Sequence, residues 1–74
     1  MHELKVRKAN IKKDELVFYG YDTWDRPTWL YKNKYYLKDV TLKGSENNIP
    51  KILYDTADGE FDGEPNNPYE IILI

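Results

Sequence analysis

Residues 18–36 read FYGYDTWDRPTWLYKNKYY and hold eight of the eleven aromatic residues of the chain. Aromatic and β-branched side chains pack well on a pleated surface and lose rotamer freedom in a helix, so this composition favours strands. Within this stretch, residues 28–31 and 35–42 flank Lys32-Asn33-Lys34, and Asn33 tolerates a left-handed backbone. The stretch therefore predicts a β-hairpin at the centre of the protein.

Four further strands are expected around this hairpin. The alternation of Leu4 and Val6 with charged residues predicts a strand over residues 3–8. Residues 15–21 are apolar on both faces and predict a second strand, in which Gly20 indicates a bulge or a bare backbone covered by a neighbouring ring. Residues 51–55 and 69–74 complete the set, and the apolar run 71–74 should be paired within the sheet, because an open edge of this kind aggregates.

The chain has 74 residues, which predicts one domain spanning residues 1–74. No window shows clean helical periodicity, although residues 11–16 could form a single turn. We expect an all-β or β-rich fold, either a small antiparallel barrel or a strongly curved sheet of five to six strands, with a sheet covered by one helix as the main rival. The predicted core residues are Leu16, Phe18, Val40, Ile52 and Ile71.

Charge is distributed unevenly along the sequence. Residues 1–51 hold all eleven Lys and Arg and seven acids, a net charge of +4, whereas residues 52–74 hold six acids and no base, a net charge of −6. The simplest interpretation is that opposite ends of one domain lie together and partly neutralise. The chain contains no cysteine, and neither a spanning segment nor a signal peptide is evident, so we expect a cytoplasmic protein without a membrane partner.

The sequence offers little for catalysis. Its one histidine is His2 and its one serine is Ser45, neither in a recognisable nucleophile turn, and the glycines form no phosphate-binding loop. We therefore predict no enzymatic activity, no catalytic residues and no cofactor. The acidic residues 55–64 do not fit the spacing of an EF-hand, and we expect a mobile, solvated loop anchored by Phe61 and holding no metal. A metal-assisted hydrolase remains a second alternative, using the carboxylates Asp58, Glu60, Asp62 and Glu64.

The interleaving of rings and cations is the more suggestive pattern. We predict a non-enzymatic binding module whose contact residues are Trp24, Arg26, Trp29, Tyr31, Lys34 and Tyr36, with a protein as its partner. The alternative is a binder of single-stranded nucleic acid, which would stack bases on the same rings. Trp24 lies in a predicted turn and is expected to be an exposed contact residue, although it could instead fold back over Gly20. The oligomeric state stays open.

Three short segments also resemble a known group of proteins. These are DTWDRP at residues 22–27, YLKDV at 36–40 and FDGEP at 61–65. Over about residues 19–68 the chain resembles small uncharacterised accessory proteins of conjugative transposons and prophages of Gram-positive bacteria. The resemblance implies a mobile-element accessory protein and assigns no functional residues. Physically, the segments suit a turn, a strand and an acidic loop held together, with Arg26 pairing Asp62 or Glu64.

Overall fold

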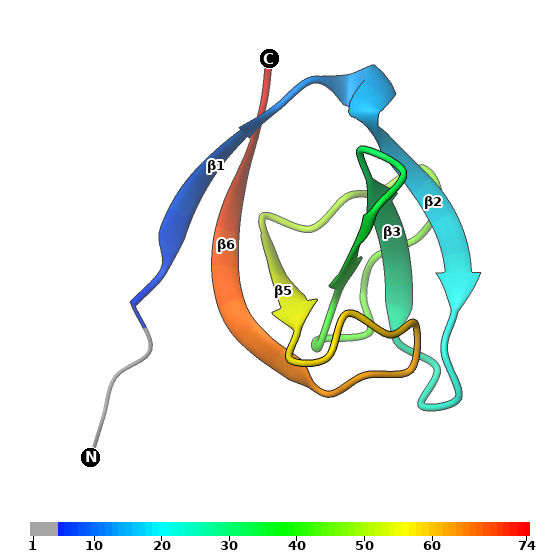
Figure 1. The fold of residues 1–74 in the computed structure, drawn as a ribbon. Helices are drawn as coiled ribbons and strands as arrows, with labels where there is room; N and C mark the ends of the chain where they lie inside the picture. Colours follow the sequence, from blue (N-terminus) through cyan, green and yellow to red (C-terminus); the bar gives the residue numbers. More distant parts are fainter. Residues whose placement is uncertain (1–4) are drawn as a thin grey trace.

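The computed structural model describes residues 5–74, which form one six-stranded sheet in the order β1-β6-β5-β4-β3-β2 (Figure 1). The strands are β1 (Arg7–Ile11), β2 (Leu16–Tyr21), β3 (Pro27–Tyr31), β4 (Tyr35–Lys38), β5 (Ile52–Thr56) and β6 (Pro65–Leu73). A short 3₁₀ turn, η1 (Lys13–Glu15), joins β1 to β2, where a single turn was predicted. The predicted all-β class is confirmed, and no helix among residues 5–74 is long and apolar enough to cross a bilayer.

The sheet is strongly curved but not closed. Strands β1 and β2 end the strand order and do not pair with each other, so of the two predicted architectures the curved sheet is correct and the barrel is not. The sheet is mixed, because β1 pairs with β6 in parallel while the other neighbouring strands pair antiparallel. The terminal apolar run is paired as expected, since β6 lies between β1 and β5.

The central hairpin is confirmed, and its turn has the expected conformation. Lys32 and Asn33 both have positive φ, and the Lys34 N–H donates to the Tyr31 carbonyl. Strand β4, however, ends at Lys38 and does not reach residue 42. The buried Asp39 carboxylate accepts the backbone N–H groups of Thr41 and Gly44, which fold the chain into a loop.

Two other strand expectations need adjustment. Strand β1 begins at Arg7, later than the predicted start at residue 3, and residues 1–4, including His2, lie outside the described part of the chain. The bulge at Gly20 is confirmed by a register shift between Phe18 and Gly20, and Gly20 has a φ of 142°. Nothing lies within 4 Å of the position a Cβ would take at Gly20, so no ring covers it.

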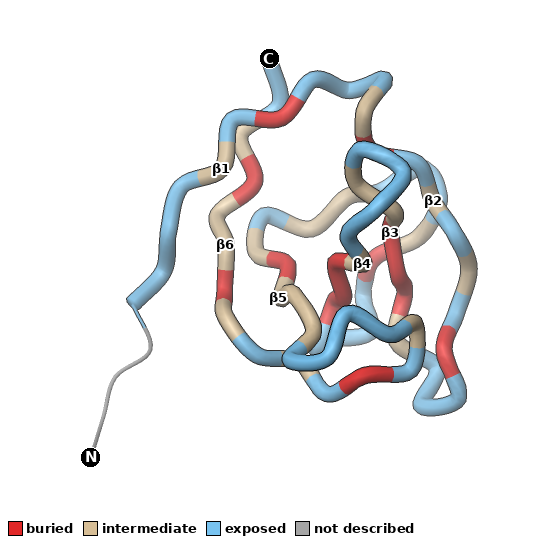
Figure 2. The backbone as a smooth tube through the Cα atoms, viewed as in Figure 1, coloured by how far each residue is buried: buried red, intermediate tan, exposed pale blue. Residues whose placement is uncertain are grey.

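The core lies on the concave face of the sheet (Figure 2). Its buried apolar residues are Ile11, Leu16, Trp29, Leu37, Leu53 and Ile71. Leu16 and Ile71 were predicted, whereas Phe18 and Ile52 are only half-buried. The prediction for Val40 is wrong: this side chain is 42% exposed, because β4 has already ended and Val40 belongs to the following loop.

Candidate functional site

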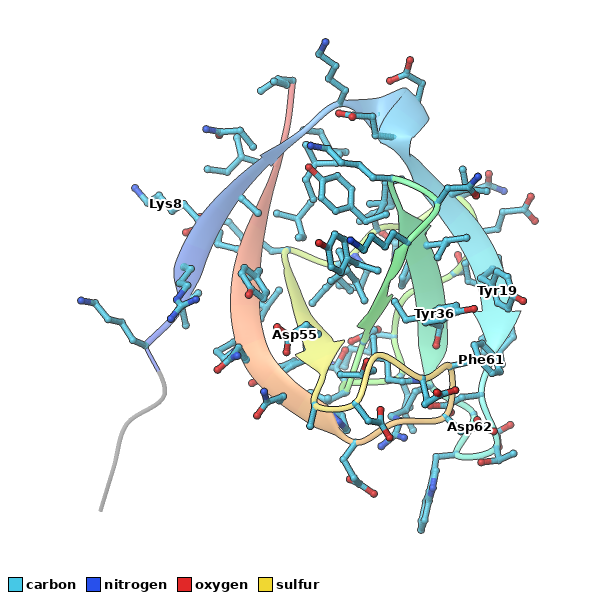
Figure 3. The ribbon with its side chains drawn as sticks, in the orientation of Figure 1. Lys8, Tyr19, Tyr36, Asp55, Phe61 and Asp62 are labelled. Atoms are coloured by element: carbon cyan, nitrogen blue, oxygen red, sulfur yellow. The ribbon has the colours of Figure 1, made fainter. Side chains whose placement is uncertain are left out.

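The convex side of the β2-β3-β4 sheet carries a cluster of apolar and aromatic side chains. The register places Val17 beside Leu30 and Leu30 beside Tyr36, so these three residues share the face opposite the core. Tyr19 and Phe61 complete the cluster, and Figure 3 shows both rings close to Tyr36. We call Val17, Tyr19, Leu30, Tyr36 and Phe61 the outer aromatic face.

The three rings of this face contact one another, edge to face for Tyr36 with each of the other two and tilted for Tyr19 with Phe61. Ring centroids are 5.3 Å apart for Tyr19 and Tyr36, 5.1 Å for Tyr19 and Phe61, and 5.7 Å for Tyr36 and Phe61. Such pairs stabilise a fixed arrangement of rings. Tyr19 is nevertheless 53% exposed and Val17 59% exposed. Contiguous exposed apolar surface of this kind is typical of an interaction site.

A buried polar cluster supports the outer aromatic face from below. The side chain of Lys38 is fully buried, and its Nζ donates to the Asp22 carboxylate at 2.7 Å and to the Phe61 carbonyl. Lys38 Nζ also lies 5.1 Å from the centre of the Phe61 ring. Because Lys38 is in β4 and Phe61 is in a loop, this ammonium group holds the loop, with its ring, against the sheet.

Asp22 is the counter-ion of the cluster. Its buried carboxylate accepts Lys38 Nζ, Arg26 Nε and the backbone N–H groups of Trp24 and Arg26. Burial alone would raise the pKa of Asp22, but these donors outweigh it and hold the pKa well below its ordinary value. The expected pairing of Arg26 with Asp62 or Glu64 is wrong. Arg26 pairs instead with Asp22, which lies four residues before it in the chain and directs its carboxylate toward the guanidinium.

The acidic loop is tied to this cluster by a second contact. Asp62 Oδ1 accepts the backbone N–H of Thr23 at 3.0 Å and lies 3.3 Å from the Thr23 hydroxyl. Together with the Lys38 contact to Phe61, this bond anchors the loop to the turn between β2 and β3. The sequence predicted a mobile loop anchored by Phe61. The Phe61 ring does pack against the sheet, at Tyr36, and the loop is also hydrogen-bonded through the Phe61 carbonyl and the Asp62 carboxylate. The β2–β3 turn, the end of β4 and the acidic loop are thus held together, as the three short motifs suggested.

The ionised state of Asp22 predicts a specific response to acid. A carboxylate whose pKa is lower in the folded than in the unfolded chain stabilises the fold above about pH 4, its ordinary pKa, and this stabilisation is lost as the pH falls further. The Asp22 side-chain carboxyl carbon should therefore show no titration by NMR between pH 7 and about pH 3. A titration midpoint near pH 4 would contradict the buried ion pair.

Calcium should leave the acidic loop unchanged. Asp58 Oδ1 accepts the backbone N–H of Glu60, and Asp62 is bonded to Thr23, so both carboxylates already have donors. Within residues 5–74, no group of three or more acidic or histidine side chains is arranged to hold a metal ion. Amide shifts over residues 57–64 should therefore not respond to millimolar Ca²⁺. Saturable shifts confined to this loop would revive the hydrolase alternative.

The six predicted contact residues fall into four places. Tyr36 is in the outer aromatic face, and Trp24 lies in the β2–β3 turn, 67% exposed, so it does not cover Gly20. Arg26 is next to it, with its guanidinium 5.9 Å from the Trp24 ring and mostly buried against Asp22. Trp29 is only 1% exposed, because β3 turns it into the core, and the prediction that it contacts a partner is wrong.

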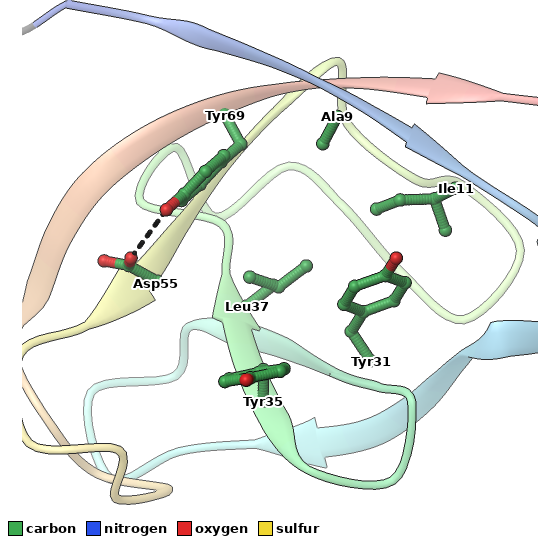
Figure 4. Close-up of a pocket in the computed structure, with 7 residues that line it drawn as sticks. All are labelled: Ala9, Ile11, Tyr31, Tyr35, Leu37, Asp55 and Tyr69. Atoms are coloured by element: carbon green, nitrogen blue, oxygen red, sulfur yellow. Dashed lines mark hydrogen bonds between the residues drawn. The ribbon is translucent and has the colours of Figure 1, made fainter.

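Tyr31 lines a pocket on the concave side (Figure 4). Lys34 does not line this pocket, but its Nζ lies 5.3 Å from the centre of the ring of Tyr35, which does. The pocket has a volume of about 340 Å³ and an apolar floor made by Ala9, Ile11 and Leu37. Three tyrosines line its walls, Tyr31, Tyr35 and Tyr69. Asp55 forms its polar end, where the Tyr69 hydroxyl donates to the Asp55 carboxylate at 3.1 Å.

The sequence analysis missed several residues of these sites. Side chains alternate between the two faces of β2, so Val17 and Tyr19 lie on the face opposite to that of Leu16. The outer position of Tyr19 could therefore have been predicted. The pocket had no such signal, because its lining comes from five strands that are separated along the chain. Comparisons of the chain with models of known protein families, with characterised proteins and with solved structures found no match.

Proposed function

We propose that this protein is a non-enzymatic module that binds another protein through the outer aromatic face. The observation that carries the proposal is the ring cluster of exposed Tyr19 with half-buried Tyr36 and Phe61, held in place by a fully buried Lys38. A cluster fixed before binding loses little conformational entropy on association. Tyrosine is also one of the residue types enriched in interfaces. Trp24, exposed in the adjoining turn, is proposed as a peripheral contact.

The charges around this face favour a protein over a nucleic acid. A single-strand binder needs free cations beside its rings, to contact phosphates. Arg26 and Lys38, which the sequence interleaves with the rings, are both paired with Asp22. The loop that carries Phe61 adds four carboxylates, those of Asp58, Glu60, Asp62 and Glu64. The Tyr19 hydroxyl, partial burial and the Glu60 carboxylate raise the pKa of Tyr36.

The same charges define the chemistry of the partner. An apolar surface bordered by carboxylates complements a segment that carries apolar or aromatic side chains together with Lys or Arg. We therefore propose that the partner presents an apolar segment with basic residues. The mobile-element resemblance stays a prediction, and it is compatible with a small accessory protein of this kind acting in the cytoplasm.

Binding of selected peptides tests the proposed function. Peptides selected from a random library against this protein should be rich in aromatic and basic residues. Tyr19→Ser should weaken their binding by about 2 kcal/mol, roughly 30-fold in Kd, because an interface aromatic is lost. Isothermal titration calorimetry measures this difference.

Tyr35→Ser provides the matched control. Tyr35 is 51% exposed, close to the 53% of Tyr19, but it lines the pocket on the concave side. The proposal requires that this variant binds the selected peptides as the parent does. Equal losses in the two variants would contradict it. So would binding of oligothymidylate that is stronger than peptide binding and falls steeply with salt, which would favour the nucleic-acid alternative.

A further inference from the structure

Cations lie beside three of the tyrosines that line the pocket on the concave side. In β1, Arg7 shares a face with Ala9 and Ile11, and its register partner is Tyr69. On the opposite side, Lys32 Nζ lies 5.3 Å from the centre of the Tyr31 ring and Lys34 Nζ lies 5.3 Å from that of Tyr35. Three positive groups therefore surround a pocket that contains one carboxylate, that of Asp55.

The polar end of the pocket is already satisfied. The Asp55 carboxylate accepts both the Tyr69 hydroxyl and the backbone N–H of Asn67, the latter at 2.7 Å. Burial and the Asp55 carboxylate raise the pKa of Tyr69, while Arg7 acts in the opposite sense, which places the guanidinium near this hydroxyl. Asp55 thus serves to orient Tyr69, and the uncompensated charge at the entrance is positive.

We infer that this pocket binds a small aromatic molecule bearing a carboxylate. The flat ring would lie on the floor of Ala9, Ile11 and Leu37 between the tyrosine rings, and the carboxylate would remain at the entrance beside Arg7 and Lys34. A volume of about 340 Å³ is at the small end for ligand pockets and suits one ring system with a short side chain. This inference is independent of the outer aromatic face.

Two other ligand classes fit the pocket less well. Tyrosine rings with a carboxylate can also hold an organic cation. Here, however, Lys32 and Lys34 already lie against Tyr31 and Tyr35, and a further cation would be repelled. A nucleotide combines a ring with an anion, but its sugar and phosphate add bulk beyond the one ring system that a volume of about 340 Å³ suits.

Three indole compounds of similar size and different charge test the inference. Indole-3-acetate is an anion, indole-3-acetamide is neutral and tryptamine is a cation. We expect indole-3-acetate to bind most tightly, with a Kd on the order of 1 mM or lower. The amides of Ile11, Leu37 and Tyr69 should shift in an NMR titration. The inference is overturned if tryptamine binds most tightly, if the three compounds bind equally, if uridine monophosphate binds more tightly than the carboxylate, or if no pocket amide shifts at millimolar ligand.

Charge variants separate a specific contact from a general effect of net charge. Arg7→Gln and Lys34→Gln should each weaken indole-3-acetate binding by about threefold, the scale of an exposed ion pair. Lys8→Gln is the matched control, because Lys8 is next to Arg7 but its side chain is on the opposite face of β1 (Figure 3). An equal loss in Lys8→Gln would show that net charge alone governs binding. Tyr35→Ser should weaken binding of the carboxylate while Tyr19→Ser should not, the reverse of their effects on peptides.

Discussion

Lys38→Met should remove a large part of the stability of the fold. The substitution keeps the length of the side chain but removes the ammonium that bonds Asp22 and the Phe61 carbonyl. Removing one partner of a buried ion pair costs about 3–5 kcal/mol, because the other charge stays buried. A domain of this size has a total stability of only roughly 4–11 kcal/mol. Urea unfolding followed by far-UV circular dichroism measures the loss.

Two further variants show whether the ion pair is the cause. Lys34→Met removes an exposed lysine and should change the stability by less than about 0.5 kcal/mol. Adding Asp22→Leu to Lys38→Met removes a carboxylate that has already lost one of its two cations and keeps only Arg26, so the loss in the double variant should be smaller than the sum of the two single losses. A Lys38→Met protein as stable as the parent would show that the ammonium and the carboxylate do not meet in solution.

Trp29→Ala should be the most destabilising of the aromatic substitutions, by about 3–5 kcal/mol. Trp29 is 1% exposed, and its ring packs edge to face on Phe18 at a centroid distance of 5.3 Å. It also occupies space beside Gly44, where a Cβ would lie 2.8 Å from the ring. Deleting the indole would therefore leave a cavity at the centre of the core. Thermal unfolding of the variant and the parent measures this loss.

Trp24→Ala is the matched control, because it removes the same ring from a position that is 67% exposed. Its effect on stability should be about 0.5 kcal/mol. A loss as large as that of Trp29→Ala would contradict the exposed position of Trp24. Phe18→Ala should fall between the two, since Phe18 is half-buried against the core.

The positions of the strands could be predicted from the sequence better than the burial of their side chains. Alternation and turn chemistry located β2, β3 and the hairpin turn within about two residues, because both signals are local. The alternation of apolar residues does not show where a strand ends when a side-chain hydrogen bond ends it. The buried carboxylate of Asp39 ended β4 early, and for that reason the predicted burial of Val40 was wrong.

The polar cluster beneath the outer aromatic face is the part of the structure that the sequence predicted least well. Lysine and aspartate are rarely buried, so the sequence favoured solvent-exposed positions for Lys38 and Asp22. Their burial depends on Phe61, which follows Lys38 by 23 residues and covers the ammonium. Trp29 shows the same limit: the turn correctly predicted an exposed Trp24, whereas the strand pattern did not indicate that Trp29 faces the core.

NMR mapping of a selected peptide tests most directly whether the outer aromatic face binds protein. A ¹⁵N-labelled sample is titrated with the tightest peptide obtained from the library. The account predicts that the largest shifts occur in the outer aromatic face, at Val17, Tyr19, Leu30, Tyr36 and Phe61, with smaller shifts at Trp24. Largest shifts around the pocket, at Tyr31, Tyr35 and Tyr69, with none in the outer aromatic face, would contradict it.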